Sequence, residues 1–254
     1  MDIIILAGGF GTRLSEYTHT IPKPMVIIGD RPILNHIINL YASYEQKSFY
    51  IAMGYKSEEV IKHFVGKDGL EETRGDELIR VKDYNDEYYK NGIDISLVNT
   101  GIDTMTGGRI KKIKKYSKSN RFMVTYGDGL SDINIKNLLD FHIERKKIGT
   151  VTAVRPPARF GELDIEGDKV IKFEEKPQLQ KGWINGGFFV FERSFFDLID
   201  DDFTMLEREP MIALTKANNL NAFKHEGFWQ CMDTKRDRDF LEDMWNKNNR
   251  PWII

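Results

Sequence analysis

The chain has 254 residues, with 37 Lys and Arg against 39 Asp and Glu, so its formal net charge is −2. This balance gives no reason to expect binding to nucleic acid or to an anionic membrane surface. No apolar run approaches the roughly 20 residues that a membrane-spanning helix needs. The one cysteine, Cys231, excludes an intramolecular disulfide and argues against a cysteine metal site. The acidic N-terminus leads into an apolar run without a signal-peptide pattern, so we expect a cytoplasmic protein.

Apolar strands alternate with amphipathic helices through the first half of the chain. We expect strands at residues 3–6, 48–53, 95–98, 122–125 and 150–154. Apolar residues at helical spacing predict helices at 33–41, at 60–64 with Ser57 as its cap, and at 135–142. This alternation indicates an α/β fold: a Rossmann-like mixed, mostly parallel sheet with helices on both faces.

The second half of the chain has shorter apolar runs, at 162–165, 170–173 and 188–191, with turns between them. They predict a small antiparallel β addition. A helix is expected from about Thr234 to Trp245. The polar segment 71–91 is interpreted as a surface insertion, with a mobile flap near the site or an oligomer contact as the alternatives. Because no linker or repeat interrupts the chain, we predict a single domain spanning 1–254.

A glycine-rich loop follows the first strand and is the most informative segment of the chain. Backbone N–H groups in such a loop can bind phosphate oxygens, and Arg13 and Lys23 add two cations. Leu14 stands where a Rossmann dinucleotide fingerprint needs its third glycine, and the Gly-Lys-Ser/Thr ending of a P-loop is missing. We therefore predict a polyphosphate site formed by Leu6, Ala7, Gly8, Gly9, Phe10, Gly11, Thr12 and Arg13.

Together with Pro22-Lys23-Pro24-Met25, this loop resembles the signature of the sugar nucleotidyltransferases. These enzymes join a nucleoside triphosphate to a sugar 1-phosphate and release pyrophosphate. The resemblance implies that Arg13 and Lys23 are catalytic cations that hold the phosphates. The attacking phosphate is dianionic near neutral pH, with a second pKa near ~6, so no general base is required.

The resemblance also implies Mg²⁺ held by two aspartates. Asp128, in Tyr126-Gly127-Asp128-Gly129, matches the metal aspartate of the family and follows the strand at 122–125. Ligands of open α/β sheets bind at that end of the strands, and Mg²⁺ needs only one or two carboxylates. Asp233 matches the second metal aspartate, although Thr234 stands where the family often has glycine. Taken alone, Asp128 would be interpreted as a turn aspartate, and the alternative for Asp233 is a helix N-cap, which is compatible with metal binding.

Two motifs resemble the acceptor site of the family, in which a lysine contacts the sugar phosphate and an amide lies near the sugar. They are Glu174-Glu175-Lys176-Pro177 and Asn185-Gly186-Gly187-Phe188. The alternative for each is an ordinary β-turn with an exposed charge. The acceptor-binding residues implied are Glu175, Lys176, Asn185, Gly186 and Arg159. The nucleotide-binding half would then span about 1–130 and the acceptor-binding half about 131–254.

The segment Met105-Thr106-Gly107-Gly108-Arg109 resembles a motif of the glucose-1-phosphate cytidylyltransferases. The resemblance implies that Thr104, Gly108 and Arg109 bind the nucleotide, CTP. The acceptor implied is α-D-glucose 1-phosphate, and in that family CDP-glucose supplies surface polysaccharide synthesis. It also implies a homo-oligomer, from dimer to hexamer.

Three alternatives stay open. In the first, CTP is used with a different acceptor: another hexose 1-phosphate, a polyol phosphate or a phosphorylated non-sugar. In the second, the chain is a sugar-nucleotide-binding homologue without turnover. A dinucleotide-dependent reductase is disfavoured, since Leu14 breaks its fingerprint and Gly54-Tyr55-Lys56 replaces the acidic residue it needs.

Overall fold

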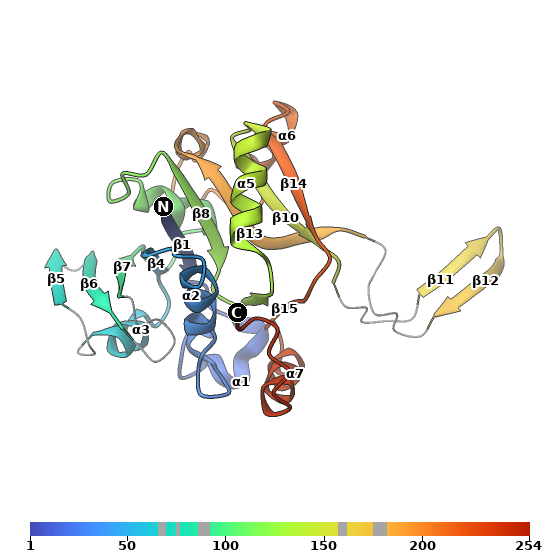
Figure 1. Cartoon of the computed structure of the whole chain (residues 1–254), viewed down its shortest axis with the longest axis horizontal. Coiled ribbons are helices and arrows are strands. Elements are labelled where there is room, and N and C mark those ends of the chain that lie inside the picture. The colour runs from blue at the N-terminus through green and yellow to red at the C-terminus, as the bar shows by residue number, and fades with distance from the viewer. Residues whose placement is uncertain (66–69, 75–76, 86–91, 157–161, 175–181) are drawn as a thin grey trace.

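A nine-stranded sheet forms the centre of the molecule, in the order β14-β10-β13-β8-β1-β4-β7-β6-β5 (Figure 1). The computed structural model describes residues 1–65, 70–74, 77–85, 92–156, 162–174 and 182–254. The strands of this sheet are β1 (Asp2–Ala7), β4 (Ser48–Met53), β5 (Leu70–Arg74), β6 (Leu78–Tyr84), β7 (Ile93–Asn99), β8 (Arg121–Tyr126), β10 (Gly149–Val154), β13 (Ile184–Glu192) and β14 (Leu220–His225).

Most of these strands run in one direction. β1 pairs in parallel with β4 and β8, β4 with β7, and β10 with β14. β13 and β6 run against their neighbours, so the sheet is mixed but mostly parallel, as predicted. In register, Leu6 lies opposite Tyr126, and Met53 lies between Ala7 and Asn99. The C-terminal ends of four strands therefore meet at one edge, where ligands of open α/β sheets bind.

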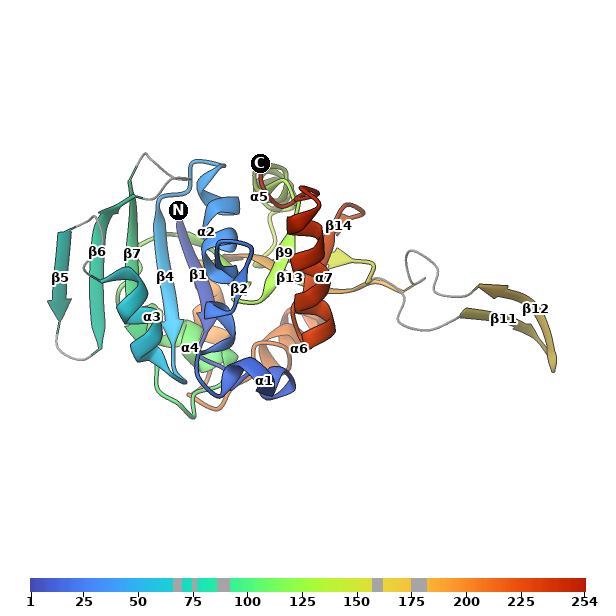
Figure 2. The same cartoon turned by 90° about the horizontal axis from the view of Figure 1, so that it is seen from below.

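Helices cover both faces of the sheet (Figure 2) because β1 is apolar on both sides. Ile3 and Ile5 face a core shared with α2 (Ile33–Ala42), α3 (Ser57–Phe64), α5 (Ile135–Arg145) and α7 (Lys235–Asn246). Ile4 and Leu6 point the other way, as alternation along a strand requires, into a core shared with α4 (Thr106–Ile113), η3 (Arg193–Leu198) and α6 (Glu209–Lys216). The short elements η1 (Thr12–Leu14), α1 (Ser15–Thr18) and η2 (Lys23–Met25) follow the first strand.

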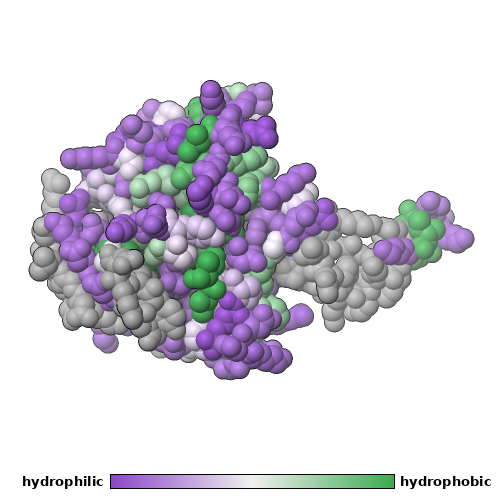
Figure 3. All heavy atoms as spheres, in the orientation of Figure 1, coloured by the Kyte–Doolittle hydropathy of each residue, from purple (hydrophilic) through white to green (hydrophobic). Residues whose placement is uncertain are grey.

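Three small antiparallel pairs complete the fold: β2 (Ile27–Ile28) with β3 (Arg31–Pro32), β9 (Gly129–Ser131) with β15 (Trp229–Cys231), and β11 (Glu162–Glu166) with β12 (Lys169–Glu174). The β11–β12 hairpin stands away from the rest of the molecule (Figures 1 and 2). It accounts for two of the three runs expected in the antiparallel addition, whereas the third run, 188–191, lies in β13 of the central sheet, antiparallel to β8 and β10. Apolar side chains gather on it (Figure 3), with Ile165 57% and Ile171 51% exposed.

Some local expectations were wrong. Helix α3 is preceded by Lys56 in the left-handed conformation, with φ of 52°, and Ser57 is its first residue rather than its cap. The segment 71–91 is not only a surface insertion, because it contributes β6 to the sheet and buries Tyr84 in the core. The residues of that segment at 75–76 and 86–91 lie outside the described part of the chain. Among the described residues, no helix has the length and apolarity to cross a membrane.

Candidate active site

The glycine loop leaves β1 at the sheet edge and turns sharply at Gly11. Gly11 has φ of 62°, in the left-handed region that favours glycine. A Cβ atom there would lie 2.9 Å from the Thr18 side chain and 3.1 Å from Cβ of Lys23. The absence of a side chain thus lets the loop pack against the segment that carries Lys23, so the two phosphate-binding elements predicted from the sequence are adjacent.

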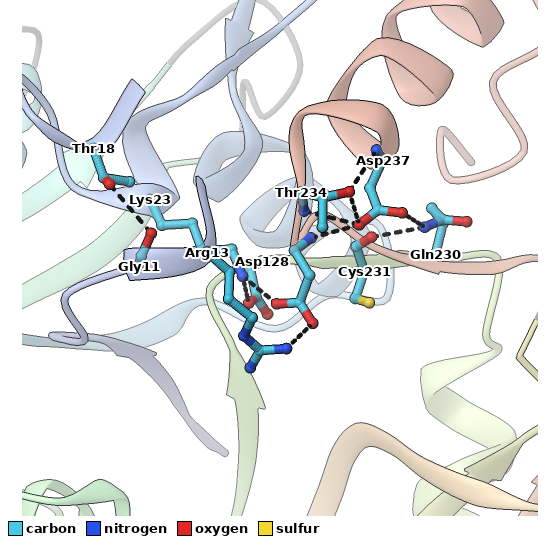
Figure 4. A network of polar contacts seen from close by, with 10 residues as sticks. Gly11, Arg13, Thr18, Lys23, Asp128, Gln230, Cys231, Thr234 and Asp237 are labelled. Atoms are coloured by element: carbon cyan, nitrogen blue, oxygen red, sulfur yellow. Dashed lines mark hydrogen bonds and ion pairs between the residues drawn. The ribbon is translucent and has the colours of Figure 1, made fainter. Parts of the chain in front are cut away.

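Lys23 lies between two carboxylates (Figure 4). Its Nζ atom is 2.5 Å from Oδ2 of Asp128 and 2.7 Å from Oδ1 of Asp233. The Lys23 side chain is only 12% exposed. Burial by itself would lower the pKa of Lys23, but the two carboxylates outweigh it and raise the pKa. Lys23 is therefore a full cation near neutral pH, held where both predicted metal aspartates converge.

Asp233 reaches Asp128 through the pairing of two short strands distant in sequence. β15 runs antiparallel to β9, with Cys231 opposite Gly129, and the N–H of Met232 donates to the carbonyl of Asp128 at 2.8 Å. Each aspartate thus lies beside this β9–β15 ladder. Since the ladder is built from backbone hydrogen bonds, the carboxylates are positioned independently of any ligand.

Thr234, which departs from the family pattern, begins helix α7. Its side chain accepts from the N–H of Asp237, and Asp237 accepts from the N–H of Thr234, forming a capping box. The same Asp237 carboxylate accepts from the N–H of Asp233 at 3.1 Å (Figure 4). The helix cap expected at Asp233 is thus Thr234. This arrangement leaves the Asp233 side chain available to the site and fixes its backbone.

Arg13 is the second cation of the cluster and lies on η1. Its Nη1 atom donates to Oδ2 of Asp233 at 2.8 Å, and its side chain is 75% exposed. The neighbouring Cys231 thiol is no candidate nucleophile, because burial and then the carboxylates of Asp233 and Asp128 raise its pKa to about 12. The cluster therefore holds two cations and two carboxylates, of which Arg13 is the most accessible to a ligand.

Arg109 is buried beneath the glycine loop and bonded to the protein itself. It is 4% exposed, and its guanidinium donates to the carbonyls of Gly8, Met53, Gly101 and Ile102 at 2.7 to 3.1 Å and to the Thr100 hydroxyl at 2.6 Å. Burial lowers its pKa to about 10. Arg109 thus joins the loops that follow β1, β4 and β7, and a Cβ atom on Gly8 would lie 2.2 Å from its Nη1.

One cavity of about 740 Å³ collects most of the predicted nucleotide and metal residues. Its walls include every residue from Leu6 to Arg13, together with Lys23, Thr104, Arg109, Asp128 and Asp233. Gly108 does not line it; its N–H donates to the carbonyl of Thr204 at 3.2 Å. The direct role of Gly108 at the nucleotide stays a prediction.

The structure describes two of the five predicted acceptor residues, Asn185 and Gly186. Asn185 lines a smaller cavity of about 260 Å³ and bonds Tyr126 Oη through its Nδ2 at 3.3 Å. The carbonyl of Gly186 accepts from the indole of Trp229 at 2.7 Å. Arg159, Glu175 and Lys176 lie outside the described residues, so their roles stay predictions.

Sequence reasoning missed two side chains near these cavities, Phe203 and Glu207. Phe203 lines the larger cavity. Glu207 lines the smaller one and accepts hydrogen bonds from Tyr126 Oη at 2.5 Å and Thr106 Oγ1 at 2.7 Å. Burial and then the Glu207 carboxylate raise the pKa of Tyr126. Neither residue lies in a recognisable motif, so only their position in the fold reveals them.

Comparison with known proteins shows the family to which the chain belongs. A model of the nucleotidyl transferase family matches residues 2–239, and the chain belongs to this family. It is 45% identical over 256 residues to the glucose-1-phosphate cytidylyltransferase of Salmonella typhi, covering 99% of this chain and 98% of that protein. The probable glucose-1-phosphate cytidylyltransferase of Bacillus subtilis is 37% identical over 261 residues, covering all of both chains.

More distant proteins share the family or the fold. The mannose-1-phosphate guanyltransferase of Saccharomyces cerevisiae is 30% identical over 249 residues, covering 95% of this chain and 63% of that protein. The crystal structure of HddC from Yersinia pseudotuberculosis complexed with GMP-PN superimposes with a TM-score of 0.69 at 23% identity, covering 96% of this chain and 99% of that chain. At that identity the likeness concerns the fold, which confirms the predicted fold class.

Proposed function

We propose that this protein transfers the cytidylyl group of CTP to α-D-glucose 1-phosphate, giving CDP-glucose and pyrophosphate. The observation that carries the proposal is the Lys23 ammonium group held between Asp128 and Asp233 beside the glycine loop. The choice of CTP and glucose 1-phosphate is supported by the 45% identity to the Salmonella typhi glucose-1-phosphate cytidylyltransferase over nearly the whole of both chains.

The reaction needs positioned charge more than proton transfer. A phosphate oxygen of the acceptor forms a bond to the α-phosphorus of CTP, and the bond from the α-phosphorus to the bridging oxygen breaks. Pyrophosphate leaves with that electron pair. Lys23 and the N–H groups of the loop Gly8–Thr12 would hold the phosphoryl group undergoing transfer. Arg13 would stabilise the charge that grows on the pyrophosphate. The acceptor phosphate is already dianionic near neutral pH, so no base is assigned.

The carboxylates of Asp128 and Asp233 fit Mg²⁺. Both already approach one cation, the Nζ atom of Lys23, within 2.7 Å, and Mg²⁺ is commonly held by two carboxylates with waters and substrate phosphates. Among the described residues, no group of three or more His, Cys, Asp or Glu gathers elsewhere to suggest another metal site. When bound, Mg²⁺ would neutralise charge on the phosphates, while Asp128 and Asp233 hold it.

The remaining assignments follow the two ends of the site. Thr104, which is 7% exposed and lines the larger cavity, supports placing the base of CTP beside the loop after β7. Asn185, at the smaller cavity, supports placing the hexose on the opposite side of Tyr126. We infer that the chain acts as one domain with these two halves, and that Arg159, Glu175 and Lys176 complete the acceptor side.

The exposed apolar side of the β11–β12 hairpin supports a homo-oligomer. Val170 is 49% exposed, close to the values for Ile165 and Ile171. Contiguous apolar surface on an extended hairpin is typical of protein interfaces. Multi-angle light scattering of the full chain tests this, with a dimer or larger expected; replacing all three residues with serine should reduce the assembly.

The activity is tested by pyrophosphate release. CTP, UTP, dTTP, ATP and GTP are each combined with glucose 1-phosphate, other hexose 1-phosphates and a polyol phosphate, with Mg²⁺. We expect pyrophosphate release only when CTP is combined with glucose 1-phosphate. Release with CTP and a different acceptor would keep the enzyme class and change the substrate. A folded protein that binds CTP without any release would be a non-catalytic homologue.

A further inference from the structure

The loop after η3 is anchored on the first turn of helix α4. The N–H groups of Gly107 and Gly108 donate to the carbonyl of Thr204 at 3.0 and 3.2 Å, and the N–H of Met105 donates to the carbonyl of Asp202 at 2.8 Å. N–H groups at the start of a helix have no partner within the helix. The loop thus satisfies them, and Asp202 and Thr204 are both held by backbone bonds.

The two glycines of this turn are required by the loop. A Cβ atom on Gly107 would lie 2.7 Å from the Thr204 carbonyl oxygen, and one on Gly108 would lie 2.5 Å from that of Asp202. An ion pair of 2.6 Å between Lys112 and the Asp202 carboxylate adds a further anchor. The Gly-Gly pair that resembles a nucleotide-binding motif therefore serves to dock this loop.

Phe203 lies between the two anchored residues and lines the larger cavity with 71% of its surface exposed. Ile102, at 54%, and Met105, at 43%, are exposed apolar residues of the same cavity. Water-exposed side chains of this size gain free energy when a ligand covers them. Because Asp202 and Thr204 on either side are fixed by backbone bonds, the largely exposed side chain of Phe203 is held at the cavity.

We propose that Phe203 supplies the apolar surface against which the base of the nucleotide packs, an inference that rests on the proposed function. The cavity that Phe203 lines also holds the glycine loop, Arg13 and Lys23, which provide N–H groups and cations for phosphates. The base is the one flat group of a nucleoside triphosphate that an aromatic ring can cover, and Phe203 is anchored beside Met105, next to Thr104. Stacking accepts any base, so Phe203 contributes affinity without choosing among bases.

The test compares a nucleotide with a ligand that lacks a base. Dissociation constants of CTP and of inorganic tripolyphosphate are measured by calorimetry for the wild-type chain and Phe203→Ala. We expect the constant for CTP to rise about 5- to 150-fold, as loss of one stacking contact predicts, and the constant for tripolyphosphate to stay unchanged. The same rise is expected for UTP and dTTP wherever the wild type binds them. Phe240→Ala, at an aromatic residue of α7 that is 47% exposed, is the matched control.

Three outcomes would overturn the inference while leaving the proposed function intact. They are unchanged CTP affinity, equal weakening of CTP and tripolyphosphate, and weakening of glucose 1-phosphate alone. A wild-type chain that binds tripolyphosphate but not CTP would instead remove the proposed function itself. Phe203→Trp gives an independent readout, the fluorescence of the new tryptophan, obtained by subtracting the wild-type signal. We expect this fluorescence to change when CTP is added and not when glucose 1-phosphate is added. A response only to glucose 1-phosphate would place Phe203 on the acceptor side.

Discussion

The Nζ atom of Lys23 lies 2.5 Å from the carboxylate of Asp128, although the two residues are 105 positions apart in the chain. Lys23 follows the glycine loop, and Asp128 lies in the turn after the central strand β8. Their contact places a buried cation at the C-terminal edge of the sheet, where ligands of open α/β sheets bind. A buried cation whose partners are carboxylates is stabilised in its charged form, so the contact keeps Lys23 protonated near neutral pH.

Loss of charge at this contact should remove most of the turnover while the protein stays folded. For Lys23→Ala and for Asp128→Asn we expect kcat to fall about 10²- to 10³-fold, the effect typical of removing one group that stabilises transition-state charge. Steady-state pyrophosphate release measures this, with circular dichroism as the folding check. Lys136→Ala removes a surface lysine that is 72% exposed and should retain full activity. A near-wild-type rate in either site variant would remove that residue from its assigned role.

Lys23 should also compete with a metal ion for the two carboxylates. The ammonium group occupies the space between Asp128 and Asp233, and its removal would leave two like charges that attract a divalent cation. We expect Mn²⁺ alone to bind Lys23→Ala at least about tenfold more tightly than the wild type, a difference of about 1.4 kcal/mol. Electron paramagnetic resonance of unbound Mn²⁺ measures it.

The control for this metal experiment is the double variant Lys23→Ala with Asp128→Asn, which should lose the added affinity. Equal Mn²⁺ affinity of the wild type and Lys23→Ala would show that the ammonium group of Lys23 does not compete with the metal ion for the two carboxylates. Such a result would leave the turnover prediction standing, because that prediction depends on the charge of Lys23 at the phosphates.

Replacing Arg109 should destabilise the fold as well as the site. Its guanidinium donates to four backbone carbonyls and one hydroxyl while only 4% exposed. For Arg109→Met we expect the free energy of unfolding to fall by about 3 kcal/mol, since buried carbonyls lose their donors. Arg109→Lys should recover only part of this, because an ammonium has three donors. Urea unfolding measures both, and exposed Arg236→Met should change little.

A side chain at Gly108 should detach the loop that carries Phe203. The new Cβ atom would lie 2.5 Å from the carbonyl oxygen and 2.6 Å from the Cα atom of Asp202. Because both are backbone atoms, the backbone must move to relieve this clash. Gly108→Ala is expected to lower the free energy of unfolding by about 1–3 kcal/mol and to weaken CTP binding. Gly182→Ala, where no atom lies within 4 Å of the added Cβ, is the control. Equal stability in the two variants would contradict this account of the glycine.

Acid should unfold the protein partly through His36. Burial lowers its pKa to about 4 from the ordinary 6.5. Its Nε2 lies 2.9 Å from the Ile28 carbonyl, and its Nδ1 accepts from the Trp252 indole at 3.3 Å. Both contacts suit the neutral ring with hydrogen on Nε2, since a proton on Nδ1 would face the indole N–H. The folded state therefore disfavours the protonated ring.

Because the folded-state pKa is the lower one, the contribution of His36 is fully present above about pH 6.5 and is lost as pH falls toward 4. The shift of 6.5 to about 4 corresponds to about 3 kcal/mol. Urea unfolding of the wild type and of His36→Gln between pH 7 and 4 measures the difference in slope. Parallel pH profiles of the two proteins would show that His36 does not contribute to the loss of stability in acid. Burial also lowers the pKa of His142, so His142 accounts for part of the slope that both proteins share.

The sequence by itself determined the elements whose physics is local. The expected strand at 48–53 is β4 with the same bounds, and the helix expected after Pro32 is α2, because apolar periodicity records which faces are buried. The glycine loop was also recognisable, since the left-handed conformation of Gly11 depends on the residue's own freedom. The charged segment 71–91 was wrongly expected to be only a surface insertion. Its strand β6 forms because it pairs with β7, and nothing within its own residues encodes that partner.

Only the tertiary structure decided which distant side chains meet. Asp233 reaches Asp128 because β15 pairs with β9, and Phe203 reaches the cavity because its loop docks on α4. Neither outcome has a local signal, since each depends on backbone hydrogen bonds between segments far apart in the chain. Arg109 shows the same division: a motif resemblance predicted that it contacts the nucleotide, which stays a prediction, whereas only the structure shows that it also braces the segments at the ends of β1, β4 and β7. Composition supplies the charges, and the order of the strands decides which of them face one another.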